Sequence, residues 1–344
     1  MTSLTLRRPD DWHLHLRDGD ALRAVLPYTA ARFARAIVMP NLKPPVTTTA
    51  QAIAYREQIV RALPQGARFE PLMTLYLTDR TDPVEADRAK QSGVVHGFKL
   101  YPAGATTNSA DGVTDIRHID GVLARMAELG VVLQVHGEVT SPSVDVFDRE
   151  ARFIDTVLAG IVDRFPTLRV VFEHITTRAA ADFVRSARQG VAATITPQHL
   201  LMNRNALFNG GIRPHHYCLP VLKTEGDRRA LLDVIASADP RFFLGTDSAP
   251  HARSAKEAAC GCAGVFSAPA AIELYAEVFD ALGALGHLEG FASLFGADFY
   301  DLPRNQEKLT LLKESWEVPA CYPFGNQTIV PLRAGERVAW RIAA

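Results

Sequence analysis

Residues that bind metals stand at the ends of several apolar runs in this sequence. The first run, D-W-H-L-H-L-R, carries two histidines two residues apart, His13 and His15. Because side chains alternate across a β-strand, this spacing puts both imidazoles on one face of an extended segment. Later runs end in further polar residues of this kind: Lys99, His136, His174 and Asp247.

Four histidines and an aspartate suit zinc, which binds neutral imidazole nitrogen and carboxylate oxygen. A single histidine is more often a hydrogen-bonded core or surface residue than a ligand. We interpret the remaining ones in that way: His96, His118, His199, His215, His216 and His287. Four histidines and an aspartate gathered at the ends of several strands favour a metal site instead.

Lys99 does not fit a metal site in its usual form, because a divalent cation repels an ammonium strongly at short range. Either the side chain points outward or binds an anion, or a modification removes its positive charge. A lysine carbamate would be anionic, and its two oxygens could bridge two metals. Spacing alone leaves these alternatives open.

Eight short apolar or β-branched runs are predicted to be strands, and most are nearly all apolar, as strands covered on both faces are. They are 11–16, 35–41, 69–77, 94–100, 131–136, 168–174, 191–196 and 242–247. Helical patterns lie between most of them, for example at 48–63, 120–130 and 149–165. This alternation predicts a (β/α)8 barrel, in which chemistry gathers at the C-terminal ends of the strands. An open doubly wound sheet is the alternative, but no G-x-G-x-x-G follows the first strand.

The barrel is predicted to fill about residues 9–300 of a single domain, 1–344. Residues 197–225 contain G-G and several prolines and are expected to form an extended loop at the rim of the site. Residues 301–344 form a small β appendage in this prediction. Within it, 327–342 resemble short strands with a turn, expected to pair with residues 4–8.

Composition gives no support to several classes of partner. Lys and Arg total 37 and Asp and Glu total 38, so charge gives no reason to expect nucleic acid or an anionic membrane as a partner. No apolar run reaches transmembrane length and no signal peptide is visible, so we expect a soluble cytoplasmic protein. The four cysteines are expected to be reduced structural thiols rather than metal ligands: Cys218, Cys260, Cys262 and Cys321.

The ordered motifs resemble the amidohydrolase superfamily and, more narrowly, the dihydroorotases of the shorter bacterial type. They include H-L-H-L-R, M-P-N-L-K-P-P, F-K-L-Y-P, V-H-G-E, F-E-H-I-T-T and G-T-D-S-A-P-H. H-x-H alone is a weak motif, but the full ordered set is specific, and the similarity covers almost the whole chain.

The resemblance implies two zinc ions per subunit, bridged by a carboxylated Lys99. It implies that His13, His15 and Asp247 hold one zinc and that His136 and His174 hold the other. The family substrate is dihydroorotate, whose ring opens reversibly to N-carbamoyl-L-aspartate in pyrimidine biosynthesis. A homodimer is the family expectation.

For Asp247 we expect a catalytic role as well, taking a proton from the attacking hydroxide and passing it to the leaving ring nitrogen. Arg17, two residues beyond His15, is expected on the same strand face, where its guanidinium suits a substrate carboxylate. The loop 101–112 is predicted to be a lid. The resemblance implies substrate-binding roles for a larger set: Arg17, Asn41, Thr106, Thr107, His136, Leu219, His251, Ala263 and Gly264.

Two other functions remain open. A hydantoinase or allantoinase would share the metal set, and only the carboxylate-binding residues Arg17, Asn41 and His251 favour dihydroorotate. A catalytically silent barrel acting as a structural subunit would be expected to have lost ligands, whereas this chain retains six.

Overall fold

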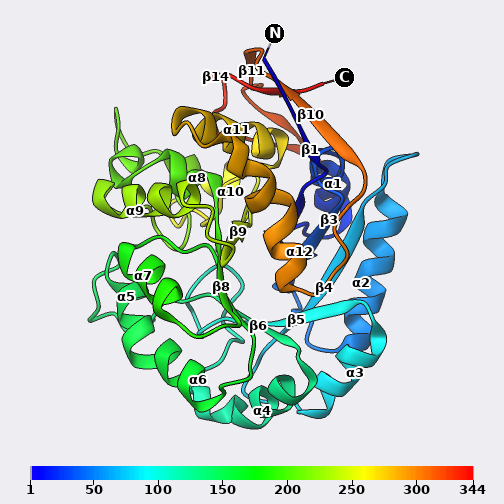
Figure 1. Ribbon diagram of the computed structural model, residues 1–344, viewed down its shortest axis with the longest axis vertical. Coiled ribbons are helices and arrows are strands. Elements are labelled where there is room, and N and C mark those ends of the chain that lie inside the picture. The colour runs from blue at the N-terminus through cyan, green and yellow to red at the C-terminus, as the bar shows by residue number, and fades with distance from the viewer. Residues whose placement is uncertain (1, 344) are drawn as a thin grey trace.

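A parallel barrel of eight strands lies at the centre of the molecule (Figure 1). The computed structural model describes residues 2–343. The strands pair in chain order and each overlaps one predicted run: β2 (Asp10–Leu14), β3 (Arg35–Val38), β4 (Glu70–Tyr76), β5 (Val95–Leu100), β6 (Val132–Val135), β7 (Val170–Phe172), β8 (Val191–Ile195) and β9 (Phe242–Leu244). The predicted barrel class is confirmed.

The barrel closes between its first and last strands just beyond the end of β9. Leu14 and Ser248 form a parallel bridge. On either side of it, the Asp247 amide donates to the His13 carbonyl (2.8 Å) and the His15 amide donates to the Ser248 carbonyl (3.1 Å). The alternative of an open sheet is therefore wrong.

Helices surround the barrel (Figure 1). Thr48 begins one of them with a capping box, and Gly130 ends another in the left-handed region (φ 67°). The predicted helix over 149–165 is α5 (Arg149–Phe153), a π-helical turn (Ile154–Leu158) and α6 (Ala159–Arg164) in succession. The helices are α1 (Gly19–Arg32), α2 (Thr49–Ala62), α3 (Val84–Ser92), α4 (Asp120–Leu129), α5 (Arg149–Phe153), α6 (Ala159–Arg164), α7 (Arg178–Ser186), α8 (Pro197–Leu201), α9 (Glu225–Ala236), α10 (Arg253–Lys256), α11 (Ala271–Ala281) and α12 (Phe295–Phe299).

The barrel interior is packed. Trp12 of β2 stacks on Tyr300, which follows α12, with ring centroids 4.7 Å apart. The Gln134 side chain of β6 donates to the Tyr300 hydroxyl (2.8 Å). Trp12 and Tyr300 belong to a buried core inside the barrel, together with apolar side chains of other strands.

The segment 197–225 is not the extended loop that was predicted. Thr196 caps α8 through the His199 amide, and Pro197 takes its first position. Two 3₁₀ turns follow, Arg204–Leu207 and Pro214–His216. Two of the three prolines that indicated a loop, Pro197 and Pro214, instead begin short helical turns.

A small antiparallel sheet joins the two ends of the chain (Figure 1). Its order is β1 (Ser3–Arg7), β10 (Lys308–Leu312) and β15 (Arg341–Ile342). The predicted pairing of 327–342 with 4–8 is wrong, because β10 lies between β1 and β15. The appendage also contains two short ladders, β11 (Trp316–Glu317) with β14 (Arg337–Val338), and β12 (Tyr322–Phe324) with β13 (Gln327–Ile329).

The assignment of residues 1–344 to one domain stays a prediction. Within residues 2–343, every helix is too short or too polar to span a bilayer.

Candidate metal centre

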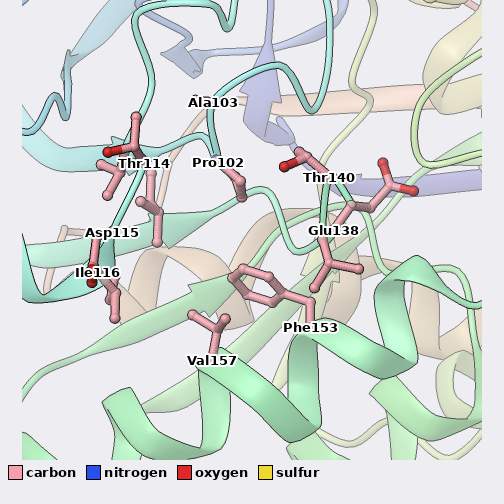
Figure 2. A pocket seen from close by; sticks show the side chains of 12 residues that line it. Pro102, Ala103, Thr114, Asp115, Ile116, Glu138, Thr140, Phe153 and Val157 are labelled. Carbon is pink, nitrogen blue, oxygen red and sulfur yellow. The ribbon is translucent and has the colours of Figure 1, made fainter. Parts of the chain in front are cut away.

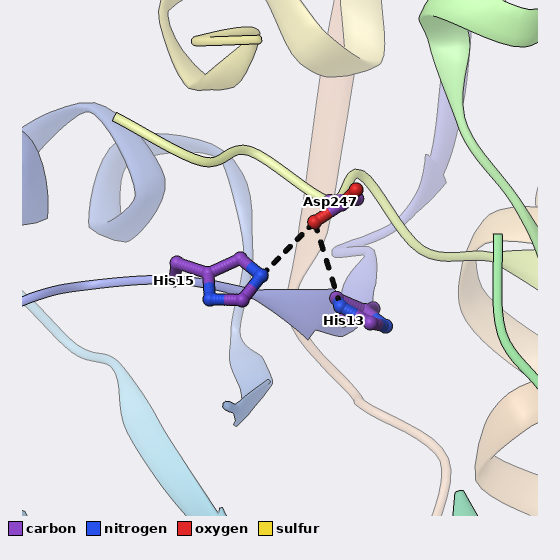
Figure 3. Close-up of side chains that lie close together, drawn as sticks. All are labelled: His13, His15 and Asp247. Atoms are coloured by element: carbon purple, nitrogen blue, oxygen red, sulfur yellow. Dashed lines mark hydrogen bonds and ion pairs between the residues drawn. The ribbon is translucent and has the colours of Figure 1, made fainter. Parts of the chain in front are cut away.

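His13, His15 and Asp247 converge at the point where the barrel closes (Figure 3). The Asp247 Oδ1 atom lies 3.0 Å from His15 Nε2 and 3.5 Å from His13 Nε2. All three side chains are buried. Their ligand atoms lie within 4.8 Å of one another, which is compact enough to hold one metal ion.

The other nitrogen of each ring has its own partner. His13 Nδ1 donates to Glu173 Oε2 (2.8 Å), and His15 Nδ1 donates to Asn41 Oδ1 (2.8 Å). These acceptors assign the ring proton to Nδ1 and leave a lone pair on Nε2. A carboxylate or carbonyl behind a histidine is the usual arrangement around a bound metal.

Two further histidines continue the cluster. The His174 ring lies between those of His13 and His136, with centroid distances of 4.9 and 4.8 Å. His136 Nε2 donates to Glu138 Oε2 (2.9 Å), so its Nδ1 remains for a ligand. The second predicted pair of ligands therefore lies beside the first.

Lys99, at the end of β5, is fully buried and its amine has no hydrogen-bond partner within the described chain. The amine lies 5.3 Å from the centre of the Tyr101 ring. Burial lowers the pKa of Lys99 to about 8, although the charges of Glu173 and Asp247 oppose this shift. An unpaired buried ammonium is costly, so the residue suits a chemically altered form.

Burial sets the electrostatics of the histidines. It lowers the pKa of His13 and of His174 well below the usual value, and that of His15 in the same direction. Burial opposes ionisation of Asp247, but the close approach of His15 and His13 and the charge of Lys99 lower its pKa to about 2. The site thus presents neutral imidazoles and an ionised carboxylate.

Two ligand candidates have unusual backbone conformations. His174 (φ 42°) and Asp247 (φ 44°) lie in the left-handed region, which non-glycine residues rarely adopt. Beside them, a Cβ at Gly245 would lie 2.7 Å from the Thr194 Cβ, so only glycine fits there. Packing and backbone geometry hold these side chains in place.

A pocket opens over the cluster. Every predicted site residue except Lys99 and His251 lines this pocket, and Lys99 is fully buried. Tyr101 and Ala249 also line it. Among the substrate-binding candidates it brings together Arg17, Asn41, Thr106, Thr107, His136, Leu219, Ala263 and Gly264.

Arg17 lies at the rim of this pocket for a different reason from the one predicted. β2 ends at Leu14, and Arg17 has a positive φ (61°), so it does not share a strand face with His15. Its guanidinium donates to His251 Nε2 (3.0 Å) and to the Pro250 carbonyl (3.1 Å). The residue reaches the pocket through the turn that leads into α1.

Both ends of the Asn41 amide are engaged. Its oxygen accepts from His15 and its nitrogen donates to the Thr107 carbonyl (3.1 Å). Thr107 Oγ1 in turn donates to the Ala263 carbonyl (3.3 Å). Asn41 therefore links the metal centre to the predicted lid, and its role as a substrate donor stays a prediction.

Sequence reasoning missed the carboxylates behind the histidines. Glu173 accepts from His13 and from Thr194 Oγ1 (2.6 Å), and Asp11 accepts from Thr246 and from the His13 amide. Glu138 and Glu173 stand inside the motifs V-H-G-E and F-E-H, so their signal was an acid close to a ligand histidine.

Glu138 also lines a larger pocket (Figure 2). Its wall is mainly apolar, with Phe153 and Val157 facing Pro102 and Thr114. It contains none of the predicted site residues, so the metal centre is not part of it.

Comparisons with known proteins identify the family of this chain. The model of the amidohydrolase family matches residues 11–309. The dihydroorotase of Laribacter hongkongensis is 67% identical over 344 residues, with all of both chains covered.

Two solved structures resemble the whole chain. The dihydroorotase of Campylobacter jejuni superposes with a TM-score of 0.91 at 35% identity, covering 99% of this chain and 98% of its own. The dihydroorotase of Saccharomyces cerevisiae in complex with 5-fluoroorotic acid gives 0.92 at 32% identity, covering 100% and 99%. This chain therefore belongs to the amidohydrolase family and, within it, to the dihydroorotases, and it is a cyclic amide hydrolase.

Proposed function

We propose that this enzyme interconverts dihydroorotate and N-carbamoyl-L-aspartate with two zinc ions bridged by a carboxylated Lys99. One arrangement carries the proposal: His13 Nε2, His15 Nε2 and Asp247 Oδ1 converge in one buried site, while the Nδ1 atom of each ring already has an acceptor elsewhere. Three acceptors that converge in a buried site repel one another unless a cation lies between them.

Neutral imidazoles with one carboxylate are ligands that zinc prefers. His13, His15 and Asp247 would hold one ion, and His136 and His174 the other. Glu173 behind His13 and Glu138 behind His136 support this assignment, since each fixes its ring and increases its basicity.

Lys99 fits a bridging role once its charge is reversed. Its neutral amine can add CO2 and release a proton, which forms a new N–C bond and replaces a cation with an anion. The buried and unpartnered amine favours this reaction, because burial raises the share of the neutral form.

When bound, the zinc ions acidify water and polarise a substrate carbonyl. Asp247 lies beside that position, and its low pKa keeps its carboxylate free of a proton. It takes the proton of the attacking water and delivers it to the ring nitrogen as the amide bond breaks. In the biosynthetic direction the proton moves the opposite way.

The rim of the pocket recognises the rest of the substrate. The Arg17 guanidinium, held by His251 and the Pro250 carbonyl, binds the substrate carboxylate. Thr106 and Thr107 close over the ring, and main-chain groups at Leu219, Ala263 and Gly264 bind its polar edge. The position of these residues around one pocket supports their roles.

A comparison of three substrates tests this function. Metal-reconstituted enzyme is expected to open dihydroorotate with a far higher kcat/KM than hydantoin or allantoin, which lack the carboxylate that Arg17 binds. A preference for hydantoin or allantoin would reassign the substrate. No turnover of any of the three by zinc-loaded protein would favour a silent structural barrel.

The homodimer also stays a prediction. Sedimentation equilibrium of the zinc-loaded enzyme tests it, and a monomer at micromolar concentration would contradict it.

A further inference from the structure

Lys256, the last residue of α10, is a buried lysine that the reaction scheme above does not use. Its ammonium donates to three main-chain carbonyls: those of Tyr217 (2.7 Å), Cys262 (2.9 Å) and Gly264 (2.7 Å). An ammonium has three protons, so this set satisfies it completely. The three acceptors come from two separate segments, one after α8 and one after α10.

Both of these segments reach the pocket over the metal centre. Leu219 lies two residues after Tyr217, and Ala263 lies between Cys262 and Gly264; both line the pocket. The Gly264 amide donates to the Tyr217 carbonyl (3.0 Å), which ties the segments to each other. Lys256 therefore lies at the junction of the two pieces of main chain that are proposed to bind substrate.

Because a peptide group is planar, a bond from Lys256 to a carbonyl also fixes the direction of the N–H group that follows it. In a trans peptide the carbonyl and the following N–H point in opposite directions. The bond from Lys256 to the Cys262 carbonyl therefore directs the Ala263 N–H away from the lysine. The Ala263 carbonyl is fixed as well, because it accepts from Thr107 Oγ1 (3.3 Å).

The segment has little freedom to take another conformation. Gly264 has φ 148°, and a Cβ there would lie 2.7 Å from the Ala249 carbonyl oxygen. This crowding admits only glycine, and the Lys256 bond holds its carbonyl at that position.

The charge of Lys256 has no carboxylate partner. Within the described chain its ammonium contacts the three carbonyls and lies 5.7 Å from the centre of the Tyr217 ring, and burial lowers its pKa to about 8. A buried cation without a carboxylate partner adds positive potential beside the pocket. An anionic substrate would benefit from that potential.

We propose that Lys256 is a positioning residue for substrate: it aligns the main chain at Ala263 and Leu219 so that these groups meet the polar edge of the bound ring. The inference rests on the proposed function, since it assumes a carboxylated cyclic amide in this pocket. It predicts an effect on substrate binding rather than on the metal centre.

Lys256→Met and Lys256→Gln test the proposal, with Lys223→Met as the control. Lys223 is also buried, but its ammonium donates to one carbonyl, that of Val221, which does not line the pocket. The readouts are KM and kcat for dihydroorotate, the Kd of 5-fluoroorotic acid, zinc content and the thermal midpoint.

Lys256→Met is expected to raise KM and the Kd of 5-fluoroorotic acid by about tenfold or more, with kcat within about threefold and zinc content unchanged. Lys256→Gln, which keeps part of the donor set, should fall between Lys256→Met and the wild type, and Lys223→Met should match the wild type in KM.

A lower thermal midpoint with unchanged KM and Kd would overturn the proposal and make Lys256 a purely structural clamp. Loss of folded, zinc-loaded protein in both Lys256 variants would overturn it too. Failure of the wild-type enzyme itself to turn over dihydroorotate would instead refute the proposed function, so the two failures are distinguishable.

Discussion

The backbone amide of Asp247 donates to the carbonyl of His13 (2.8 Å), and this bond helps to close the barrel between its first and last strands. The side chains of the same two residues converge at the candidate metal centre. The seam of the barrel therefore sets the distance between ligands that come from its first strand and from the end of its last strand.

Replacement of Asp247 by Asn is expected to reduce kcat for dihydroorotate by about 10³-fold or more, because an amide cannot carry the proton between water and ring nitrogen. Steady-state kinetics at saturating zinc measure this effect. Zinc content must be determined in parallel, since Asp247 is also a proposed ligand. Substantial activity in a zinc-loaded variant would exclude the carboxylate as the proton carrier.

Replacement of Glu173 by Gln should weaken zinc binding about 10- to 100-fold. The Glu173 carboxylate accepts the Nδ1 proton of His13 (2.8 Å), and a neutral amide makes that ring less basic. Competition with a chromophoric chelator measures the affinity, and far-UV circular dichroism shows whether the fold is kept. Equal zinc affinity in a folded variant would show that Glu173 does not tune His13.

The double change of Thr106 and Thr107 to Ala should lower kcat about tenfold while zinc content stays the same. The Thr107 hydroxyl donates to the Ala263 carbonyl, so its removal takes away one of the bonds that hold the loop over the pocket. Ser141→Ala, at an exposed turn, is the control. Wild-type kinetics in the double variant would rule out the lid.

His96 predicts a pH dependence of stability away from the site. Burial, with the charges of Arg35, Arg56 and Lys90, lowers its pKa to about 4 in the folded chain. The unfolded state, with a pKa near 6.5, binds the proton first as the pH falls. The free energy of unfolding therefore decreases between about pH 6.5 and pH 4 because of this group.

His96→Gln removes that contribution. The free energy of unfolding is compared at pH 7.5 and at pH 4.5 for each protein. Its decrease between these two pH values should be about 1–2 kcal/mol smaller in the variant than in the wild type. Urea unfolding at a series of pH values gives the comparison. Parallel curves for the two proteins would contradict the assigned shift.

The order of strands and the ligand candidates could be predicted from the sequence, because both depend on local patterns. Apolar runs with polar ends identified each barrel strand. The polar residues at these ends were the ligand candidates, of which His13 is the first and Asp247 the last in the chain. The fold then brings such ends together by the general geometry of barrels.

Other features depend on contacts that a local pattern does not contain. Arg17 was expected on a strand face, but the strand ends early and the chain turns with a positive φ. β10 lies between β1 and β15, and this order depends on the pairing of segments that are far apart in the sequence. The three carbonyls around Lys256 likewise come from two loops that only the folded chain brings together.

The most direct measurement is a zinc titration of metal-free enzyme, prepared with bicarbonate present, that follows ring opening of dihydroorotate. The account predicts no activity without metal and a rise that reaches its plateau at about two zinc ions per chain, one for each histidine pair. Full activity in the metal-free enzyme, or a zinc-saturated enzyme that leaves dihydroorotate unchanged, would contradict it.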